Sequence, residues 1–302
     1  MSQAVYLIDA SVWIFRAWFS ISDAMTGPGG MPVNAFYGYA GFLLDVIDEE
    51  NPINMAVAFD ESLTSSYRNE IFPAYKANRE LPPPELEAQF GLCRRFTAAL
   101  GISEMASPRY EADDIIGTLA RLQREQGRSC VVVTRDKDLT QVLKPGDEFW
   151  DYSGRRRLAY GQIANAFGVL PERMADFLAL TGDPVDNIPG VPGVGKKTAT
   201  VLLTEFESLE HLYQDLPRVK ELPLRGAARI FDKLSQHKED AMLARRLTVI
   251  ADDMPLEGVN VARSAPNLEL LLEVLDEAGL GGRLRRRSEA LHAAYAGEPP
   301  GP

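Results

Sequence analysis

The chain has 302 residues, of which 45% are hydrophobic and 25% are charged, and its formal net charge is −11. This composition supplies a sizeable folded core and excludes global disorder, and the two cysteines form no ligand cluster with the three histidines, which argues against a zinc site. No apolar stretch is long enough to span a membrane, and the N-terminus lacks the basic region of a signal peptide, so a cytoplasmic protein is expected.

The negative charge at first argues against a nucleic-acid partner, because contacts with phosphate groups require Lys and Arg. Nine of the acidic residues, however, belong to the single cluster described below. Removing nine negative charges from −11 leaves −2, and two divalent cations would offset four of the nine. The acidity therefore indicates a metal site more than avoidance of DNA.

Three short apolar runs predict buried parallel strands, and each one leads to an aspartate. They are VYLID at 5–9, MAVAFD at 55–60 and CVVVTRD at 130–136. Helical patterns at 35–50 and 111–126 lie between them, and this alternation predicts an α/β fold with a mostly parallel sheet flanked by helices. Because sites in such sheets form beyond the carboxyl ends of the strands, we expect Asp9, Asp60 and Asp136 to meet there.

Basic and aromatic residues alternate in YRNEIFPAYKANR at 67–79. Arg68, Lys76 and Arg79 can bind phosphates, and the ring of Tyr75 can stack on an unpaired base. Taken alone, the pattern is more typical of an amphipathic surface with solvated charges. The prolines at 82–84 interrupt helical structure, so a mobile loop or arch is expected over about 65–95.

Six further acidic residues occur in three short motifs. Glu111, Asp113 and Asp114 belong to YEADD, Asp138 to TRDKD, and Asp183 and Asp186 to TGDPVDN. YEADD opens a helix, where the helix dipole favours acids, and Glu111 and Asp114 should share a face. Each motif alone is common at turns and helix starts. Together with three strand-end aspartates, the motifs predict one acidic cluster.

Nine carboxylates in one place would repel one another unless cations neutralise them or some remain protonated. Oxygen ligands without His or Cys suit Mg²⁺, with Mn²⁺ as a substitute. Two such ions about 4 Å apart would activate a water and stabilise the leaving oxygen during hydrolysis of a phosphodiester. The cluster therefore predicts a two-metal nuclease centre.

Beyond about residue 160 the pattern becomes helical, with segments expected at 160–168, 171–181, 196–206, 226–236 and 238–250. The stretch IPGVPGVGKKT between two of these segments predicts a helix–hairpin–helix motif that grips a DNA backbone. Its candidate DNA-binding residues are Gly190, Gly193, Gly195, Lys196 and Lys197. The alternative is an ordinary Gly/Pro loop with two solvated lysines. A P-loop is excluded, because Lys197 stands where that motif requires Ser or Thr.

The ordered motifs LIDA, AFDE, YRNEIFPAYKANR, YEADD, TRDKD, TGDPVDNIPG and GVGKKTA resemble the bacterial 5′–3′ exonuclease family. That family includes the N-terminal domain of DNA polymerase I and related phage and flap endonucleases, and the resemblance covers residues 4–280. It implies a PIN-like (resolvase-like) core, a helical arch and a helix–hairpin–helix, often with a bound K⁺. The sequence departs from the family pattern at Ala10, where Gly is usual, and at Pro184 and Val185, where small or acidic residues are typical.

The resemblance also implies roles for single residues. Asp9, Asp60, Glu111 and Asp113 would mainly surround a first metal ion, and Asp114, Asp136, Asp138, Asp183 and Asp186 would mainly serve a second. Lys76 and Arg79 match arch residues that steer and stabilise the scissile phosphate, and Arg68 and Tyr75 match further DNA contacts. Because all nine acids are present, the resemblance favours an active enzyme.

These patterns divide the chain into a catalytic core at 1–160 that contains the arch, a helical lobe at 161–280 and a flexible tail at 281–302. The expected protein is a monomeric, stand-alone 5′–3′ exonuclease and 5′-flap endonuclease. Its expected partners are DNA with 5′ ends, flaps or branches, and a separate DNA polymerase. Two alternatives stay open: a non-catalytic protein that binds branched DNA, and a PIN-type ribonuclease.

Overall fold

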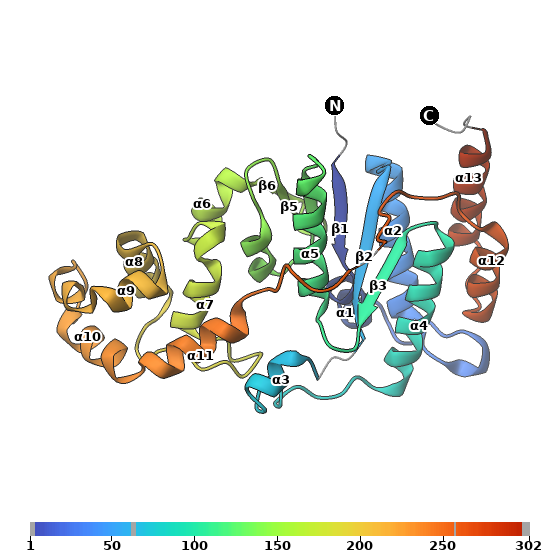
Figure 1. Cartoon of the computed structure of the whole chain (residues 1–302). Coiled ribbons are helices and arrows are strands. Elements are labelled where there is room, and N and C mark those ends of the chain that lie inside the picture. The colour runs from blue at the N-terminus through green and yellow to red at the C-terminus, as the bar shows by residue number, and fades with distance from the viewer. Residues whose placement is uncertain (1–3, 62–64, 257, 298–302) are drawn as a thin grey trace.

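The computed structural model describes residues 4–61, 65–256 and 258–297. A six-stranded sheet forms the centre of the N-terminal part, in the order β3-β2-β1-β4-β5-β6 (Figure 1). The strands are β1 (Val5–Asp9), β2 (Asn54–Asp60), β3 (Ser103–Ser107), β4 (Cys130–Val133), β5 (Glu148–Asp151) and β6 (Arg156–Ala159). β1 to β5 pair in parallel and β6 pairs antiparallel with β5, so the predicted mostly parallel α/β fold is confirmed.

The three apolar runs occur as β1, β2 and β4, but β4 is shorter than predicted. It ends at Val133, before Asp136. The chain turns there because the carboxylate of Asp136 accepts a hydrogen bond from the N–H of Asp138 at 2.9 Å and caps the short 3₁₀ helix η2 (Lys137–Val142). β3 was not predicted, because its sequence SEMAS contains no apolar run; none of its residues is fully buried.

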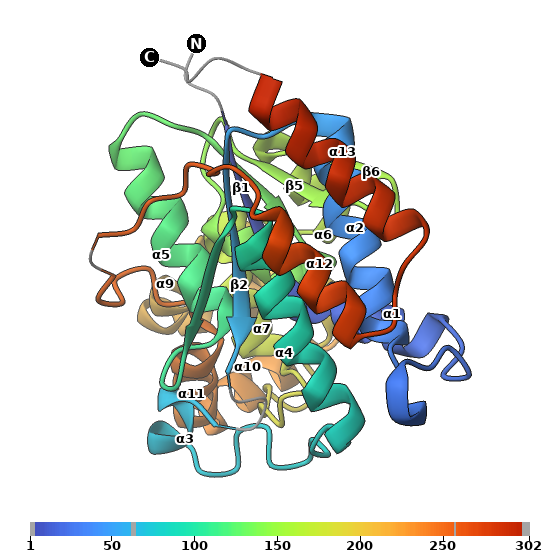
Figure 2. The ribbon, with the colours of Figure 1, turned by 90° about the vertical axis from the view of Figure 1, so that its right-hand side faces the viewer.

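Residues of β1 alternate between two hydrophobic cores, one on each face of the sheet. Tyr6 and Ile8 pack with α1 (Ala10–Ser20), α2 (Asn34–Glu50) and α4 (Pro84–Ala99), whereas Val5 and Leu7 pack with α5 (Ala112–Glu125). α12 (Leu268–Glu277) and α13 (Arg283–Gly297) add a further layer on the face that carries α2 and α4 (Figure 2). Both faces are therefore covered, as the apolar parallel strands require.

The second half of the chain forms the predicted helical lobe around a third hydrophobic core. Its helices are α6 (Ile163–Phe167), α7 (Met174–Thr181), α8 (Lys196–Phe206), α9 (Leu209–Gln214), α10 (Ala227–Gln236) and α11 (Lys238–Thr248), with the 3₁₀ turns η3 (Tyr160–Gln162), η4 (Pro171–Arg173) and η5 (Leu216–Glu221). Arg245 of α11 pairs with the buried Asp176 of α7, whose other oxygen accepts from the N–H of Leu209 at 3.0 Å. This ion pair joins three helices and orders the lobe.

The segment expected as an arch contains α3 (Tyr67–Ile71), turns and extended chain, and the first part of α4. The prolines at 82–84 do not exclude a helix: Pro84 is the first residue of α4, where its missing N–H costs nothing. α3 and the chain after it pass below the carboxyl ends of the strands in Figure 1. A further 3₁₀ turn, η1 (Pro28–Gly30), lies between α1 and α2.

The expectation of a flexible tail from residue 281 is wrong for residues 283–297, which form α13. Leu284 and Ser288 of this helix are buried, and Arg287 pairs with Asp45 at 2.8 Å and Asp48 at 2.6 Å on α2. The basic run RLRRR therefore docks on acidic positions of the core. Residues 298–302 lie outside the described residues. Within the described residues, no helix combines the length and apolarity needed to cross a bilayer.

Candidate active site

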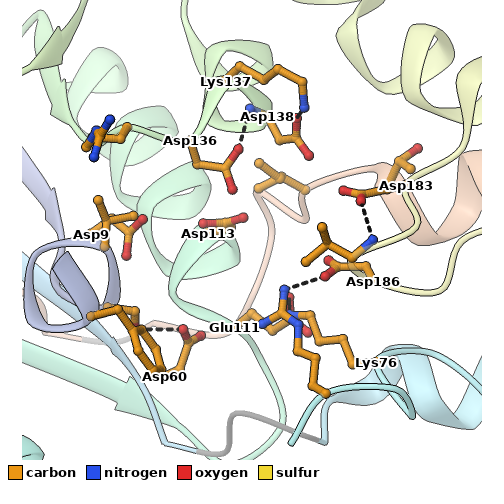
Figure 3. A pocket seen from close by; sticks show the side chains of 18 of the residues that line it. Asp9, Asp60, Lys76, Glu111, Asp113, Asp136, Lys137, Asp138, Asp183 and Asp186 are labelled. Carbon is orange, nitrogen blue, oxygen red and sulfur yellow. Dashed lines mark hydrogen bonds and ion pairs between the residues drawn. The ribbon is translucent and has the colours of Figure 1, made fainter. Parts of the chain in front are cut away.

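A cleft of about 870 Å³ lies between the carboxyl ends of the strands and the helical lobe. Eight of the nine predicted acidic residues line it, and Figure 3 shows their side chains pointing toward a common space. They are Asp9, Asp60, Glu111, Asp113, Asp136, Asp138, Asp183 and Asp186. Acidic side chains from five separate segments of the chain therefore meet in one place.

The sheet brings the first aspartates together at its carboxyl edge, where β1 and β2 lie side by side. Asp9 accepts a hydrogen bond from Thr134 Oγ1 at 3.0 Å. Asp60 accepts one from Ser11 Oγ at 2.8 Å and one from the N–H of Ala112 at 2.9 Å. Since Ala112 opens α5, Asp60 lies at the positive end of that helix dipole. Both carboxylates are thus held in direction before any ligand binds.

The start of α5 contributes two acids. Glu111 caps the helix, and its Oε2 lies 2.8 Å from Lys76 Nζ and 3.1 Å from the hydroxyl of Tyr75. Asp113 lies at the centre of the cleft in Figure 3, between Asp9 and the acids of the helical lobe. The first turn of α5 therefore connects the strand-end acids with the rest of the cluster.

Two loops supply the remaining acids. Asp136 and Asp138 follow β4, and Lys137 Nζ lies 2.6 Å from Asp138. Asp183 and Asp186 lie in the loop after α7, and an isolated bridge between Asp183 and Ile188 closes that loop. These four acids thus lie on both sides of the boundary between the sheet and the helical lobe.

Burial and mutual repulsion disfavour the ionised forms of several of these acids. Burial, and then the charges of Asp60 and Asp136, raise the pKa of Asp9 to about 7. Burial and the charge of Asp136 likewise raise the pKa of Asp138 to about 7, and burial raises the pKa of Asp113 well above its ordinary value. Although burial opposes it, the pKa of Glu111 is lowered because Lys76 and Arg68 are close. Burial and like-charge repulsion therefore act against the ionised forms of Asp9, Asp113 and Asp138.

The donor set of the cleft fits hard divalent cations. All eight acids offer carboxylate oxygens, and neither Cys nor His lines the cleft. As they stand, no three acidic side chains in the described residues surround a single point closely enough to coordinate an ion. To bind an ion the carboxylates would have to turn inward, and the positive charge of the ion would favour their ionised forms against the burial that raises their pKa values.

The structure corrects the assignments of Asp114 and Arg68. Asp114 is 0% exposed and does not line the cleft. Both of its oxygens accept hydrogen bonds at 2.8 Å from the guanidinium of Arg68, which is itself 3% exposed. Asp114 is therefore not placed as a metal ligand. Arg68 lines the cleft, but its guanidinium is occupied by Asp114 and by two backbone carbonyls. Adjacent aspartates on a helix point in different directions, so Asp113 and Asp114 cannot both face the cleft.

The other predicted arch residues also line the cleft. Tyr75 is 3% exposed, so its ring offers no surface for stacking on a base, contrary to expectation; only its hydroxyl reaches Glu111 and Asp186. Lys76 contacts Glu111, and its backbone N–H donates to the carbonyl of Asp186 at 3.0 Å. Arg79 forms an ion pair with Asp186. Lys76 therefore pairs with an acid at the start of α5, and Arg79 pairs with an acid of the loop after α7.

The segment predicted as a hairpin is the loop that joins α7 to α8. Gly190 is required by close approach, because a Cβ there would lie 2.4 Å from the backbone N of Gly182. Gly193 has a φ of +86°, and Gly195 caps α8. Lys196 and Lys197 open α8 and are exposed to solvent. Exposed N–H groups and two cations at a helix start suit an anionic ligand.

Several residues that line the cleft or support its acids were not predicted. Ser11 and Thr134 hold Asp60 and Asp9, and Arg16, Arg135 and Lys137 line the cleft. Ser11 and Thr134 each lie two residues from a predicted acid, and Lys137 stands between two of them, so proximity to the motifs was the available signal. Arg16 offers no such signal, because it comes from the middle of α1.

The chain matches two family models that together cover most of its length. Residues 4–168 match the 5′–3′ exonuclease N-terminal resolvase-like domain, and residues 169–269 match the 5′–3′ exonuclease C-terminal SAM fold. DNA polymerase I of Pseudomonas aeruginosa is 40% identical over 259 residues, covering 85% of this chain and 28% of that protein. DNA polymerase I of Bacillus caldotenax is 36% identical over 298 residues, covering 95% and 32%. The chain thus spans about a third of the length of these relatives.

Solved structures share the fold at low sequence identity. The bacteriophage T5 flap endonuclease, in a pseudo-enzyme–product complex with DNA and metal ions, gives a TM-score of 0.65 at 18% identity and covers 97% of this chain and 100% of that one. The catalytic core of Rad2 in complex with a DNA substrate gives 0.61 at 15% identity, covering 97% and 92%. The matched models and the identities with these polymerases establish that this chain belongs to the 5′–3′ exonuclease family.

Proposed function

We propose that the chain is a divalent-metal-dependent nuclease that removes nucleotides from 5′ ends of DNA and cuts 5′ flaps. One observation carries the proposal: eight carboxylates converge in a single cleft beside the cations Lys76 and Arg79. This arrangement combines a place for metal ions with positive groups for a phosphate, as phosphodiester hydrolysis requires. Family membership and the flap endonuclease named among the similar structures support the same activity.

The residues of the cleft have distinct parts in this reaction. Ions held by the acids would activate a water and offset the negative charge of the scissile phosphate. Asp9, Asp60, Glu111 and Asp113 would hold one ion, and Asp136, Asp138, Asp183 and Asp186 the other. Lys76 and Arg79 would turn from their present carboxylate partners to the phosphate and stabilise charge that develops during cleavage. Mg²⁺ is the proposed ion.

The hairpin between α7 and α8 would hold the duplex next to the cleft. Lys196 and Lys197 are exposed there, and contacts with backbone phosphates do not depend on base sequence. A K⁺ at the hairpin is part of the same proposal. The arch segment, which lines the cleft with Tyr75, Lys76 and Arg79, would admit the 5′ end. We propose a monomeric enzyme whose cut leaves a 5′-phosphate, and whose natural partner is a DNA polymerase activity, as in the relatives.

A labelled 5′-flap substrate tests the proposal directly. Cleavage is expected with Mg²⁺ or Mn²⁺ and not with EDTA. The double variant Asp136→Ala/Asp186→Ala should bind the flap in Ca²⁺ and fail to cut it. Cleavage by that variant at the wild-type rate would contradict the assigned site. Binding without cleavage by the wild-type protein would indicate a branched-DNA-binding protein, and faster cutting of a matched RNA flap would indicate a ribonuclease.

A further inference from the structure

Arg68 forms an extensively bonded buried ion pair with Asp114 beside the cleft. Nη1 and Nη2 donate to the two oxygens of Asp114, each at 2.8 Å. The guanidinium also donates from Nε to the carbonyl of Leu247 at 2.8 Å and from Nη2 to that of Val249 at 2.9 Å. A planar guanidinium offers five N–H donors in a fixed fork. These four hydrogen bonds therefore fix its position closely.

The partner carboxylate is equally occupied. Besides Arg68, Oδ1 of Asp114 accepts from the N–H of Ala251 at 2.8 Å, and Oδ2 accepts from the N–H of Glu111 at 3.1 Å. Each oxygen therefore already has two donors, which leaves Asp114 poorly suited to bind an ion. Its bond to Glu111 closes the capping box that fixes the first turn of α5. Asp113, which faces the cleft, lies in that turn.

The pair joins three parts of the molecule that carry different site residues. Arg68 belongs to α3, which precedes Lys76 and Arg79. Leu247 lies in α11, and Val249 caps its end; α11 packs against α7, the helix before the loop of Asp183 and Asp186. Asp114 belongs to α5, which carries Glu111 and Asp113. Arch, lobe and core therefore meet at one guanidinium, and each part holds side chains that must meet in the cleft.

We infer that Arg68 and Asp114 are positioning residues: their ion pair sets the distance between the acids of the core and those of the helical lobe, and neither residue contacts metal or DNA. The inference rests on the proposed nuclease function. It differs from the expectation that the sequence motifs raise, in which Asp114 binds a metal ion and Arg68 binds DNA. The two assignments predict opposite results for metal stoichiometry and for DNA affinity.

Titration with Mn²⁺ separates the two assignments, because the paramagnetic signal of the free ion reports how many ions the protein binds. Asp114→Asn should bind as many Mn²⁺ ions as the wild type, with affinity lowered about 10-fold to 100-fold, the usual effect of losing a residue that orients a ligand. Asp113→Asn, which removes a side chain at the centre of the cleft, should lose an ion. Loss of one ion from Asp114→Asn as well would overturn the inference.

DNA affinity and cleavage supply the second readout. Arg68→Met should bind a 5′-flap in Ca²⁺ as tightly as the wild type and cut it about 10-fold to 100-fold more slowly in single turnover with Mg²⁺. Because the two residues act together, Arg68→Met/Asp114→Asn should be little worse than either single variant. Additive losses, or weakened flap binding in Arg68→Met, would show independent roles and refute the pair. Arg109→Met, which removes the exposed ion pair between Arg109 and Glu70 of the same short helix α3, should leave binding and cleavage unchanged.

A single variant leaves one buried charge without its partner and can lose the fold. Arg68→Met/Asp114→Asn removes both charges, so it remains testable by Mn²⁺ stoichiometry after circular dichroism has shown native structure. Arg68→Lys keeps the charge but loses the fork, and should recover folding without full cleavage. A purely structural pair would instead lower the melting temperature and leave the Mn²⁺ affinity of the folded protein unchanged, which also refutes the inference. If the wild type binds no Mn²⁺ and cuts no flap, the proposed nuclease function fails instead.

Discussion

Replacing Asp9 with asparagine should stabilise the metal-free protein. Burial, with the charges of Asp60 and Asp136, raises the pKa of Asp9 from 3.8 to about 7. Since one pKa unit corresponds to about 1.4 kcal/mol, the ionised carboxylate costs the folded state at most roughly 4 kcal/mol. Asparagine has nearly the same shape, and its oxygen can still accept the hydrogen bond from Thr134. The variant removes the charge and leaves the local geometry in place.

The pH dependence of this effect has a definite sign. Below pH 3.8 Asp9 is protonated in both the folded and the unfolded chain, and the variant gains nothing. Between about pH 4 and 7 the unfolded chain loses its proton first, so the free energy of unfolding of the wild type falls as the pH rises. The advantage of Asp9→Asn should therefore grow over this window and be complete above pH 7.

Thermal unfolding in EDTA at pH 4 and pH 8 measures the effect. For a chain of this size, one kcal/mol shifts the melting temperature by roughly 2 °C, so Asp9→Asn should melt several degrees higher at pH 8 and equally at pH 4. Saturating Mg²⁺ should reverse the order, because the wild type gains from binding the ion. Asp215→Asn, at an exposed aspartate outside the cleft, should show no such pH dependence. A variant no more stable than the wild type in EDTA at pH 8 would refute the reasoning.

Three further predictions concern the arch and the hairpin. Lys76→Met should slow single-turnover cleavage about 100-fold to 1000-fold while leaving flap affinity in Ca²⁺ nearly unchanged, and equal losses in affinity and rate would contradict its assignment to the transition state. Gly190→Ala should lower the free energy of unfolding by about 1–3 kcal/mol. Gly195→Ala is the control, because its Cβ would meet nothing within 4 Å, and it should lower the free energy of unfolding by less. Equal melting temperatures for the two variants would disprove the close packing at Gly190. Lys196→Gln/Lys197→Gln should weaken binding to duplexes of any sequence. The slope of the logarithm of the binding constant against the logarithm of the salt concentration should become shallower by roughly two, one for each lost phosphate contact. Fluorescence anisotropy at several salt concentrations measures this slope.

The core of the fold could be predicted because its strands and helices carry strong local signals. β1 and β2 are continuous apolar runs with both faces buried, and their parallel pairing follows from the helices between them. β3 gives no such signal, since its sequence SEMAS is half-exposed throughout and pairs only with β2 in the described sheet. Its place depends on tertiary pairing, which a single sequence does not show.

The helix α13 was missed because a run of arginines suggests a solvated tail. Its buried positions nevertheless follow helical spacing, with Leu284 and Ser288 four residues apart and Leu291 packed against the same core. Arg287 then finds Asp45 and Asp48, which are three residues apart on α2. Only the combination of two distant helices makes the basic run structural. Neither segment predicts the contact alone.

The acidic motif YEADD shows that residue type alone does not determine which acids face the cleft. Its three acids suggested three ligands, because a carboxylate is equally able to bind a cation wherever it occurs. An α-helix advances 100° per residue, so Asp113 and Asp114 must leave the helix in different directions. Asp113 faces the cleft, and Asp114 faces the guanidinium of Arg68. The helical period thus allows one adjacent aspartate to serve the cleft, and the buried arginine determines that the other is Asp114.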